Sequence, residues 1–99
     1  MAKNASFVLV AYDIIDDKRR TRIMNTLLDY GGKRVNYSVF ECLLTQLELK
    51  KLRGELEGII DRSEDNIRFY ILCEKCIKNI ENYGVEVISI LDEVRIEFF

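Results

Sequence analysis

The sequence contains no histidine, no tryptophan and no proline among its 99 residues, and only three cysteines. The absence of histidine excludes Ser-His-Asp and Cys-His catalysis, histidine-ligated zinc and proton transfer by imidazole. Any acid, base or metal ligand must therefore come from carboxylates, tyrosine, lysine, cysteine or the backbone. The odd number of cysteines argues against a disulfide framework, so we expect reduced thiols and a cytoplasmic location.

Long apolar runs are also absent. No stretch reaches the roughly 18 apolar residues of a membrane span, so no membrane association is expected. Residues 1–6 lead directly into an apolar run, without the separate hydrophobic segment and cleavage site of a secretory signal. We expect one domain over residues 1–99, which is too small for a deep active site of its own. A shallow site, or one completed by a second copy of the chain, is the alternative.

The first half of the chain is expected to form a strand, a helix and two further strands. Continuous apolarity over residues 6–12 predicts a central strand that ends at Asp13. The helix is expected to begin after an N-cap at Asp16 and to end at Gly31-Gly32. The segment that follows is rich in β-branched and aromatic residues, which predicts two strands with a break near Tyr37-Ser38.

The second half is expected to add a helix, a strand, a short helix and a last strand. Thr45 and Glu48 have the spacing of a capping box, which begins the helix. Alternation predicts a strand over 66–73, a helical segment over 74–83 and a last strand over about 85–90. This order predicts an α+β, ferredoxin-like βαββαβ sandwich with an extra C-terminal strand. We expect that strand to be exchanged in a twofold dimer, which would cover the open sheet face.

Basic residues are concentrated in one segment of a chain whose net charge is -2 and whose pI is about 5.2. Those overall values argue against nucleic acid binding. Positions 18 to 34, however, contain six basic residues and a single acidic residue, Asp29, which gives this segment a local charge of +5. The basic residues are Lys18, Arg19, Arg20, Arg22, Lys33 and Arg34. The chain is therefore acidic overall and basic locally, as expected for a surface that follows a phosphate backbone.

Asp13 and Arg20 have the clearest chemical interpretations. Because Asp13 closes a buried strand, its carboxylate either caps the following loop or binds a hard cation. The helical period places Arg20 in the buried stripe of the first helix, where a guanidinium needs a fixed partner. That partner is either Asp13, in a plain ion pair, or a phosphate at the strand end. For Lys18, Arg19 and Arg22 the plain alternative to nucleic acid contact is a solvated helix face. The predicted stripe comprises Ile23, Met24, Leu27 and Leu28.

Cys73 and Cys76 form a Cys-x-x-Cys pair. Without histidine, one chain cannot complete a zinc site, although two copies could supply four thiolates. A thioredoxin-like redox site is a further interpretation. Burial as small apolar groups is the default expectation for Cys42 and Cys73. Tyr37, Ser38 and Phe40 form either a surface for nucleic acid or part of the sheet packing.

Several of these residues together resemble the CRISPR-associated protein 2 family, the small ferredoxin-like subunits of the CRISPR adaptation machinery. The resemblance rests on VLVAYDI at residues 8–14, on Asp16, on Arg19-Arg20-x-Arg22 and on YGGKRVNYSVFEC at residues 30–42. It covers the first half of the chain closely and the second half by length and element order. Asn36 stands where glutamine is commoner in the family.

The resemblance implies a homodimer with exchanged C-terminal strands and a metal-dependent phosphodiesterase. Asp13 would bind Mg²⁺ jointly with its symmetry mate, and Arg20, Arg22, Arg34 and Phe40 would contact nucleic acid. The implied function is endonucleolytic cleavage of single-stranded RNA or double-stranded DNA during spacer acquisition. The alternative is a non-catalytic scaffold that binds nucleic acid and bridges integrase subunits of the CRISPR-associated protein 1 family; in this role Arg19 would also contact nucleic acid.

The chemistry of the residues agrees with the implied nuclease. A bound Mg²⁺ lowers the pKa of its water and polarises a phosphoryl oxygen, and it needs only one or two carboxylates plus waters. No histidine is required for this chemistry. A third hypothesis, a regulatory module for a small molecule, rests only on the many functions that this fold supports.

Overall fold

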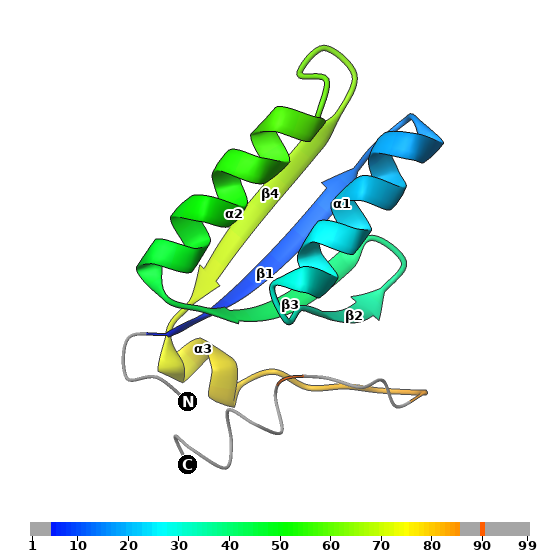
Figure 1. Ribbon diagram of the computed structural model, residues 1–99. Coiled ribbons are helices and arrows are strands. Elements are labelled where there is room, and N and C mark those ends of the chain that lie inside the picture. Colours follow the sequence, from blue (N-terminus) through cyan, green and yellow to red (C-terminus); the bar gives the residue numbers. More distant parts are fainter. Residues whose placement is uncertain (1–4, 86–89, 91–99) are drawn as a thin grey trace.

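The computed structural model describes residues 5–85 and residue 90. The elements are β1 (Ser6–Asp13), α1 (Asp17–Asp29), β2 (Lys33–Asn36), β3 (Val39–Leu44), α2 (Gln46–Ile59), β4 (Asn66–Leu72) and α3 (Glu74–Lys78). The four strands form one antiparallel sheet in the order β2-β3-β1-β4, and α1 and α2 cover one of its faces (Figure 1). The predicted ferredoxin-like α+β fold is confirmed, as is the break at Tyr37-Ser38. The strand expected over about 85–90 falls largely on residues 86–89, which lie outside the described part of the chain.

The core lies between the sheet and the two long helices. Alternation along β1 points Val8, Val10 and Tyr12 toward the helices, and none of them is more than 5% exposed. Alternation on β3 and the helical period of α2 supply most of the other buried side chains. These are Phe40, Cys42 and Leu44 from β3 and Leu49, Leu52 and Leu56 from α2. Each large apolar side chain buried here stabilises the fold by roughly 1.5 to 3 kcal/mol.

The ends of the long helices follow local sequence signals. The Asp16 carboxylate accepts a hydrogen bond of 2.9 Å from the Arg19 backbone N–H, and Thr45 and Glu48 form the predicted capping box on α2. Gly31 has a φ of +79°, a left-handed conformation that favours glycine and that terminates α1. Gly32 packs closely, because a Cβ there would lie 2.8 Å from the Leu27 carbonyl oxygen.

Two expectations for the helices are wrong. Leu28 does not belong to the buried stripe of α1, since it is 49% exposed. It lies about 100° around the helix from the fully buried Leu27, which turns it away from the sheet. The last helical segment is shorter than the predicted 74–83, because α3 ends at Lys78.

The sheet face opposite α1 and α2 is covered at one end. Phe7 at the start of β1 packs with Ile77 of α3 and with Ile90, and all three are at most 4% exposed. Farther along the same face Leu9 and Ala11 are only partly buried. We refer to this surface as the open face. Within residues 5–85 no helix has the length and apolarity to cross a lipid bilayer.

Candidate active site

Asp13 ends β1 on the open face. It pairs with Asn66 across the sheet, and alternation places it on the same side as Leu9 and Ala11. Asp13 is exposed, and its carboxylate makes no hydrogen bond or ion pair with other described residues. The carboxylate is therefore available for a ligand, and it is not used to cap the following loop.

Arg20 has the fixed partners that its place in the buried stripe requires, but Asp13 is not among them. Its Nη1 donates to the Ile14 carbonyl oxygen over 2.9 Å, and its Nη2 contacts the Asp17 carboxylate. The Asp13–Arg20 ion pair, one of the two alternatives for Arg20, is therefore wrong. Consecutive residues of a strand face opposite ways, so the Asp13 side chain points to the open face while α1 lies on the other.

Arg34 and Tyr37 form a small stacked unit at the turn between β2 and β3. Nε and Nη2 of Arg34 donate to the Tyr37 carbonyl oxygen over 3.1 and 2.7 Å. The guanidinium also lies 5.0 Å from the centre of the Tyr37 ring. Tyr37 is 74% exposed. The unit therefore presents an aromatic surface and a cation together, which suits contact with a nucleobase or a phosphate.

Arg20 and Arg34 come from different elements and approach the same side chain, Tyr12. Burial raises the pKa of the Tyr12 phenol, while the positive charges of Arg34 and Arg20 oppose that rise. Tyr12 lies inside the covered layer, next to the turn at Ser38, whose carbonyl oxygen accepts from the Tyr12 N–H over 3.0 Å. Two cations thus gather near the end of β1, on the side of the sheet opposite the Asp13 carboxylate.

Lys18 and Arg22 are exposed on α1. Neither side chain forms an ion pair with the residues that the structure describes. Their charges remain free to attract a phosphate backbone at long range. The expectation that they point to solvent is confirmed.

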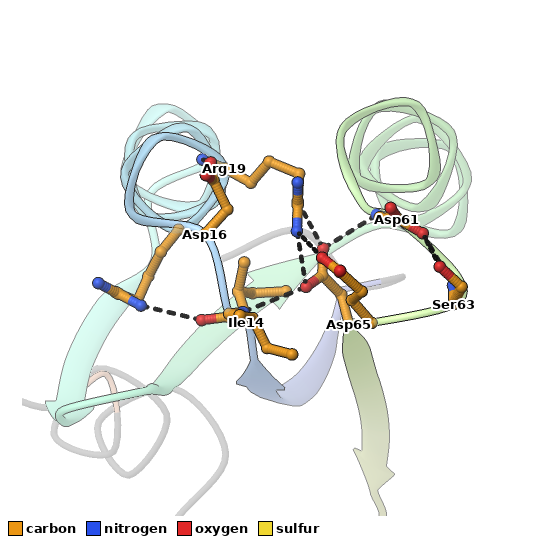
Figure 2. Close-up of polar contacts among 9 residues, drawn as sticks. Ile14, Asp16, Arg19, Asp61, Ser63 and Asp65 are labelled. Carbon is orange, nitrogen blue, oxygen red and sulfur yellow. Dashed lines mark hydrogen bonds and ion pairs between the residues drawn. The ribbon is translucent and has the colours of Figure 1, made fainter.

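Arg19 is not solvated, because its guanidinium is held by two carboxylates from the loop before β4. Its Nε donates to Oδ2 of Asp65 over 2.8 Å, and its Nη2 contacts Glu64 over 3.1 Å (Figure 2). Asp65 also accepts from the backbone N–H groups of Ile15 and Asp61. The alternative of a solvated Arg19 is therefore wrong, because its donors join α1 to the loop.

The Asp65 side chain is inaccessible to solvent, which makes these hydrogen bonds important for its charge. The hydrogen bond from Arg19 is the main reason that the pKa of Asp65 is lowered to about 2. The same contact raises the pKa of Arg19. Figure 2 shows Asp65 between the ends of α1 and α2. The sequence offered only one hint of this arrangement, the turn residues Asp61 and Ser63, which hydrogen-bond over 2.9 Å and mark a loop.

Phe40 is fully buried, so its ring does not lie on the surface where the prediction of nucleic acid contact would place it. Its ring stacks on Tyr12, with the two ring centres 6.2 Å apart. The pairing of β3 with β1 places Phe40 opposite Val10 and turns both side chains toward the helices. Tyr37 is the exposed aromatic residue of this segment.

The fit to Mg²⁺ depends on Asp13. Among the described residues, no three acidic, cysteine or histidine side chains are grouped so that they could hold a metal ion. Mg²⁺ binds one or two carboxylates and completes its shell with waters, and the exposed Asp13 supplies one such carboxylate. Asp13 therefore fits as a carboxylate ligand of Mg²⁺, and a second copy of the chain would supply the other carboxylate.

Comparison with known proteins gives a consistent result. A family model described as CRISPR associated protein Cas2 matches residues 6–80. A protein of Chloroflexus aurantiacus named CRISPR-associated endoribonuclease Cas2 3 is 43% identical over 79 residues, covering 80% of this chain and 84% of the relative.

Solved structures agree with the sequence matches. Streptococcus pyogenes Cas2 at pH 6.5 superposes with a TM-score of 0.70 at 37% identity, covering 79% of this chain and 99% of the other. A chain of a partial Cas6-RT-Cas1–Cas2 complex superposes with a TM-score of 0.67 at 34% identity, covering 78% and 83%. With the sheet order and Asp13 at the end of the first strand, these matches show that the chain belongs to the CRISPR associated protein Cas2 family.

Proposed function

We propose that this chain is an endonuclease of CRISPR spacer acquisition that hydrolyses phosphodiester bonds as a cytoplasmic homodimer, with Asp13 and Mg²⁺ at its active site. The observation that carries the proposal is the Asp13 carboxylate, which is exposed at the end of the central strand and makes no contact with other described residues. Its position on the open face allows a second copy to bring its own Asp13 nearby. The name of the Chloroflexus relative favours RNA as the substrate.

Each residue of the proposed site has a distinct task. Two Asp13 side chains, one from each chain, would hold the metal. When bound, Mg²⁺ supplies a water of lowered pKa and neutralises charge on the phosphoryl oxygens. The exposed charges of Lys18 and Arg22 attract the nucleic acid backbone, while the Arg34–Tyr37 unit offers a base a surface for stacking. Arg20 is held in place by Ile14 and Asp17, so it can meet a phosphate without losing side-chain freedom.

The test compares cleavage of a single-stranded RNA and a double-stranded DNA in Mg²⁺ by the wild-type protein and two variants. Asp13→Asn keeps the size of the side chain and removes its charge. We expect it to lose at least about 100-fold in rate, because a metal stabilises the transition state by several kcal/mol. Asp29→Asn is the matched control, since Asp29 is an exposed carboxylate at the other end of α1 and should keep full activity. Equal rates for wild type and Asp13→Asn would exclude the catalytic role.

A scaffold without catalysis is the second candidate, and the separation of charges favours it. Asp13 lies on the open face, and none of the described arginines contacts its carboxylate. Lys18 and Arg22 are exposed, as a surface that only binds nucleic acid requires. The similar chain from a complex that contains Cas1 supports a partnership with integrase subunits. In this case Asp13→Asn would leave spacer integration with Cas1 intact, whereas Lys18→Ala with Arg22→Ala would weaken it.

A further inference from the structure

The cysteine pair lies at the end of the sheet opposite Asp13. Cys73 follows the last residue of β4, Leu72, which pairs with Phe7 at the start of β1. Cys76 lies in α3, and both cysteines are exposed, which corrects the expectation that Cys73 is buried. The two Sγ atoms are 3.3 Å apart and hydrogen-bonded. A disulfide requires about 2.05 Å between sulfurs, so two exposed side chains need only a small movement to form one.

The two thiols differ in their chemistry. Hydrogen bonding with the backbone and the side chain of Cys76 lowers the pKa of Cys73. The same hydrogen bond with Cys73 raises the pKa of Cys76. Since the thiolate is the nucleophile in disulfide exchange, Cys73 is suited to attack and Cys76 to act second.

Cys42 provides an internal comparison. It is fully buried among core side chains, and burial raises the pKa of its thiol to about 12. A thiol of that kind reacts slowly. The confirmed burial of Cys42 therefore leaves Cys73 and Cys76 as the accessible thiols of the chain.

The cysteine pair is better suited to forming a disulfide than to binding a metal ion. Within the described residues no third cysteine, histidine or carboxylate completes a metal-binding group. A structural zinc site requires four ligands, and two thiols supply half of them. A dithiol that forms a disulfide needs nothing beyond the two sulfurs in contact.

We propose that Cys73 and Cys76 are a reversible redox pair that closes an intramolecular disulfide by exchange with a small-molecule disulfide of the glutathione class. The Cys73 thiolate attacks one sulfur of that compound, breaks its S–S bond and releases one thiolate. Cys76 then loses its proton to water and attacks the Cys73 sulfur, which releases the second thiolate. Both protein thiols are oxidised, and the small disulfide is reduced to two thiols. In the cytoplasm, disulfides of this kind are usually transient and sense redox conditions.

The position of the pair gives the disulfide a structural effect. Ile77 directly follows Cys76 and is buried against Phe7 and Ile90. A bond between Cys73 and Cys76 would close a small ring across the first turn of α3. It would therefore fix the junction between β4 and the apolar cluster at this end of the sheet.

The test equilibrates the full chain in mixtures of reduced and oxidised glutathione, followed by acid quenching, alkylation under denaturing conditions and peptide mass mapping. We expect wild type to lose the Cys73 and Cys76 thiols together and to regain both with dithiothreitol, while Cys42 stays alkylatable. Cys76→Ser should accumulate the mixed disulfide on Cys73. Cys73→Ser should react at least about tenfold more slowly, since only a thiolate attacks. Cys42→Ala is the matched control and should behave as wild type.

Three results would overturn the proposal. In one, Cys73 and Cys76 stay alkylatable at every ratio of the two glutathione forms. In another, wild type stops at a stable glutathione adduct. In the third, only disulfides between two chains form, as a non-reducing gel would show. Circular dichroism of each variant ensures that a failure to react is not a failure to fold.

Discussion

At one end of β1 charged side chains and backbone amides converge on Asp65, whereas at the other end Phe7, Ile77 and Ile90 pack without any charge. The charged end also carries Asp13 and the first turn of α1, and the apolar end carries the two exposed thiols. Charged contacts depend on pH and salt, while apolar contacts depend on volume and fit. The chain therefore combines an end whose stability depends on pH and salt with an end whose stability depends on apolar packing.

The largest effect is expected from removing the aromatic ring at the apolar end. Phe7→Ala should destabilise the fold by about 3 to 5 kcal/mol, because Phe7 is 2% exposed and its loss leaves a cavity. Urea denaturation at low and high salt should give the same loss. Tyr70→Ala, a change to an exposed aromatic residue of β4, is the control and should cost much less. If the loss of stability caused by Phe7→Ala changed strongly with salt, the apolar end would also depend on charge, and the two ends would not differ in this respect.

The charged end should respond to acid. Asp65→Asn is expected to destabilise the protein at pH 7, because it removes the charge that Arg19 and two backbone N–H groups hold. The pKa of Asp65 is lowered from 3.8 to about 2, so its contribution is fully present above about pH 4. The contribution is lost as the pH falls through about 2. The gap in unfolding free energy between wild type and Asp65→Asn should therefore close over that range.

Denaturation at pH 7, 4 and 2.5 measures this gap. The loss caused by Phe7→Ala should not follow the same curve, which provides the control from the other end of the strand. A gap between wild type and Asp65→Asn that stays constant down to pH 2.5 would show that the charge of Asp65 contributes nothing to stability.

The smallest effect is expected from two arginines of α1, Arg19 and Arg22, which should differ in their contributions to nucleic acid binding and to stability. Arg22→Ala should reduce the salt slope of nucleic acid binding by about one, as expected for the loss of one phosphate contact, and leave stability within about 0.5 kcal/mol. Arg19→Ala should leave the slope unchanged and lower stability, since its guanidinium is bound to Asp65 and Glu64. Binding titrations at several salt concentrations measure both slopes. Equal slopes for the two variants would contradict the structural role of Arg19.

The features that could be predicted from the sequence depend on residues a few positions apart. The N-cap at Asp16, the capping box of Thr45 and Glu48 and the stop at Gly31 are set by local hydrogen bonds and backbone angles. The sheet order follows from the order of the elements, because antiparallel strands around two helices have few arrangements.

The features that could not be predicted depend on contacts between distant residues. Arg19 meets Asp65, which lies 46 positions later, and no periodic pattern links them. Which way Phe40 points depends on the register of β3 against β1, and a shift of one residue would reverse it. Cys73 belongs to an apolar alternation, but it follows the last residue of an edge strand and meets solvent. Asp13 was found from the sequence, whereas its distance from the arginines was not.

Asp65 also has a consequence for the kinetics of folding. Its hydrogen bonds to Ile15 and Arg19 join residues 50 and 46 positions apart, and a loop of that length loses much entropy when it closes. Contacts between residues so far apart in the sequence stabilise the chain only after most of the sheet has assembled. We expect that removing the Asp65 charge speeds unfolding far more than it slows refolding. This carboxylate would then prolong the lifetime of the folded chain rather than hasten its formation.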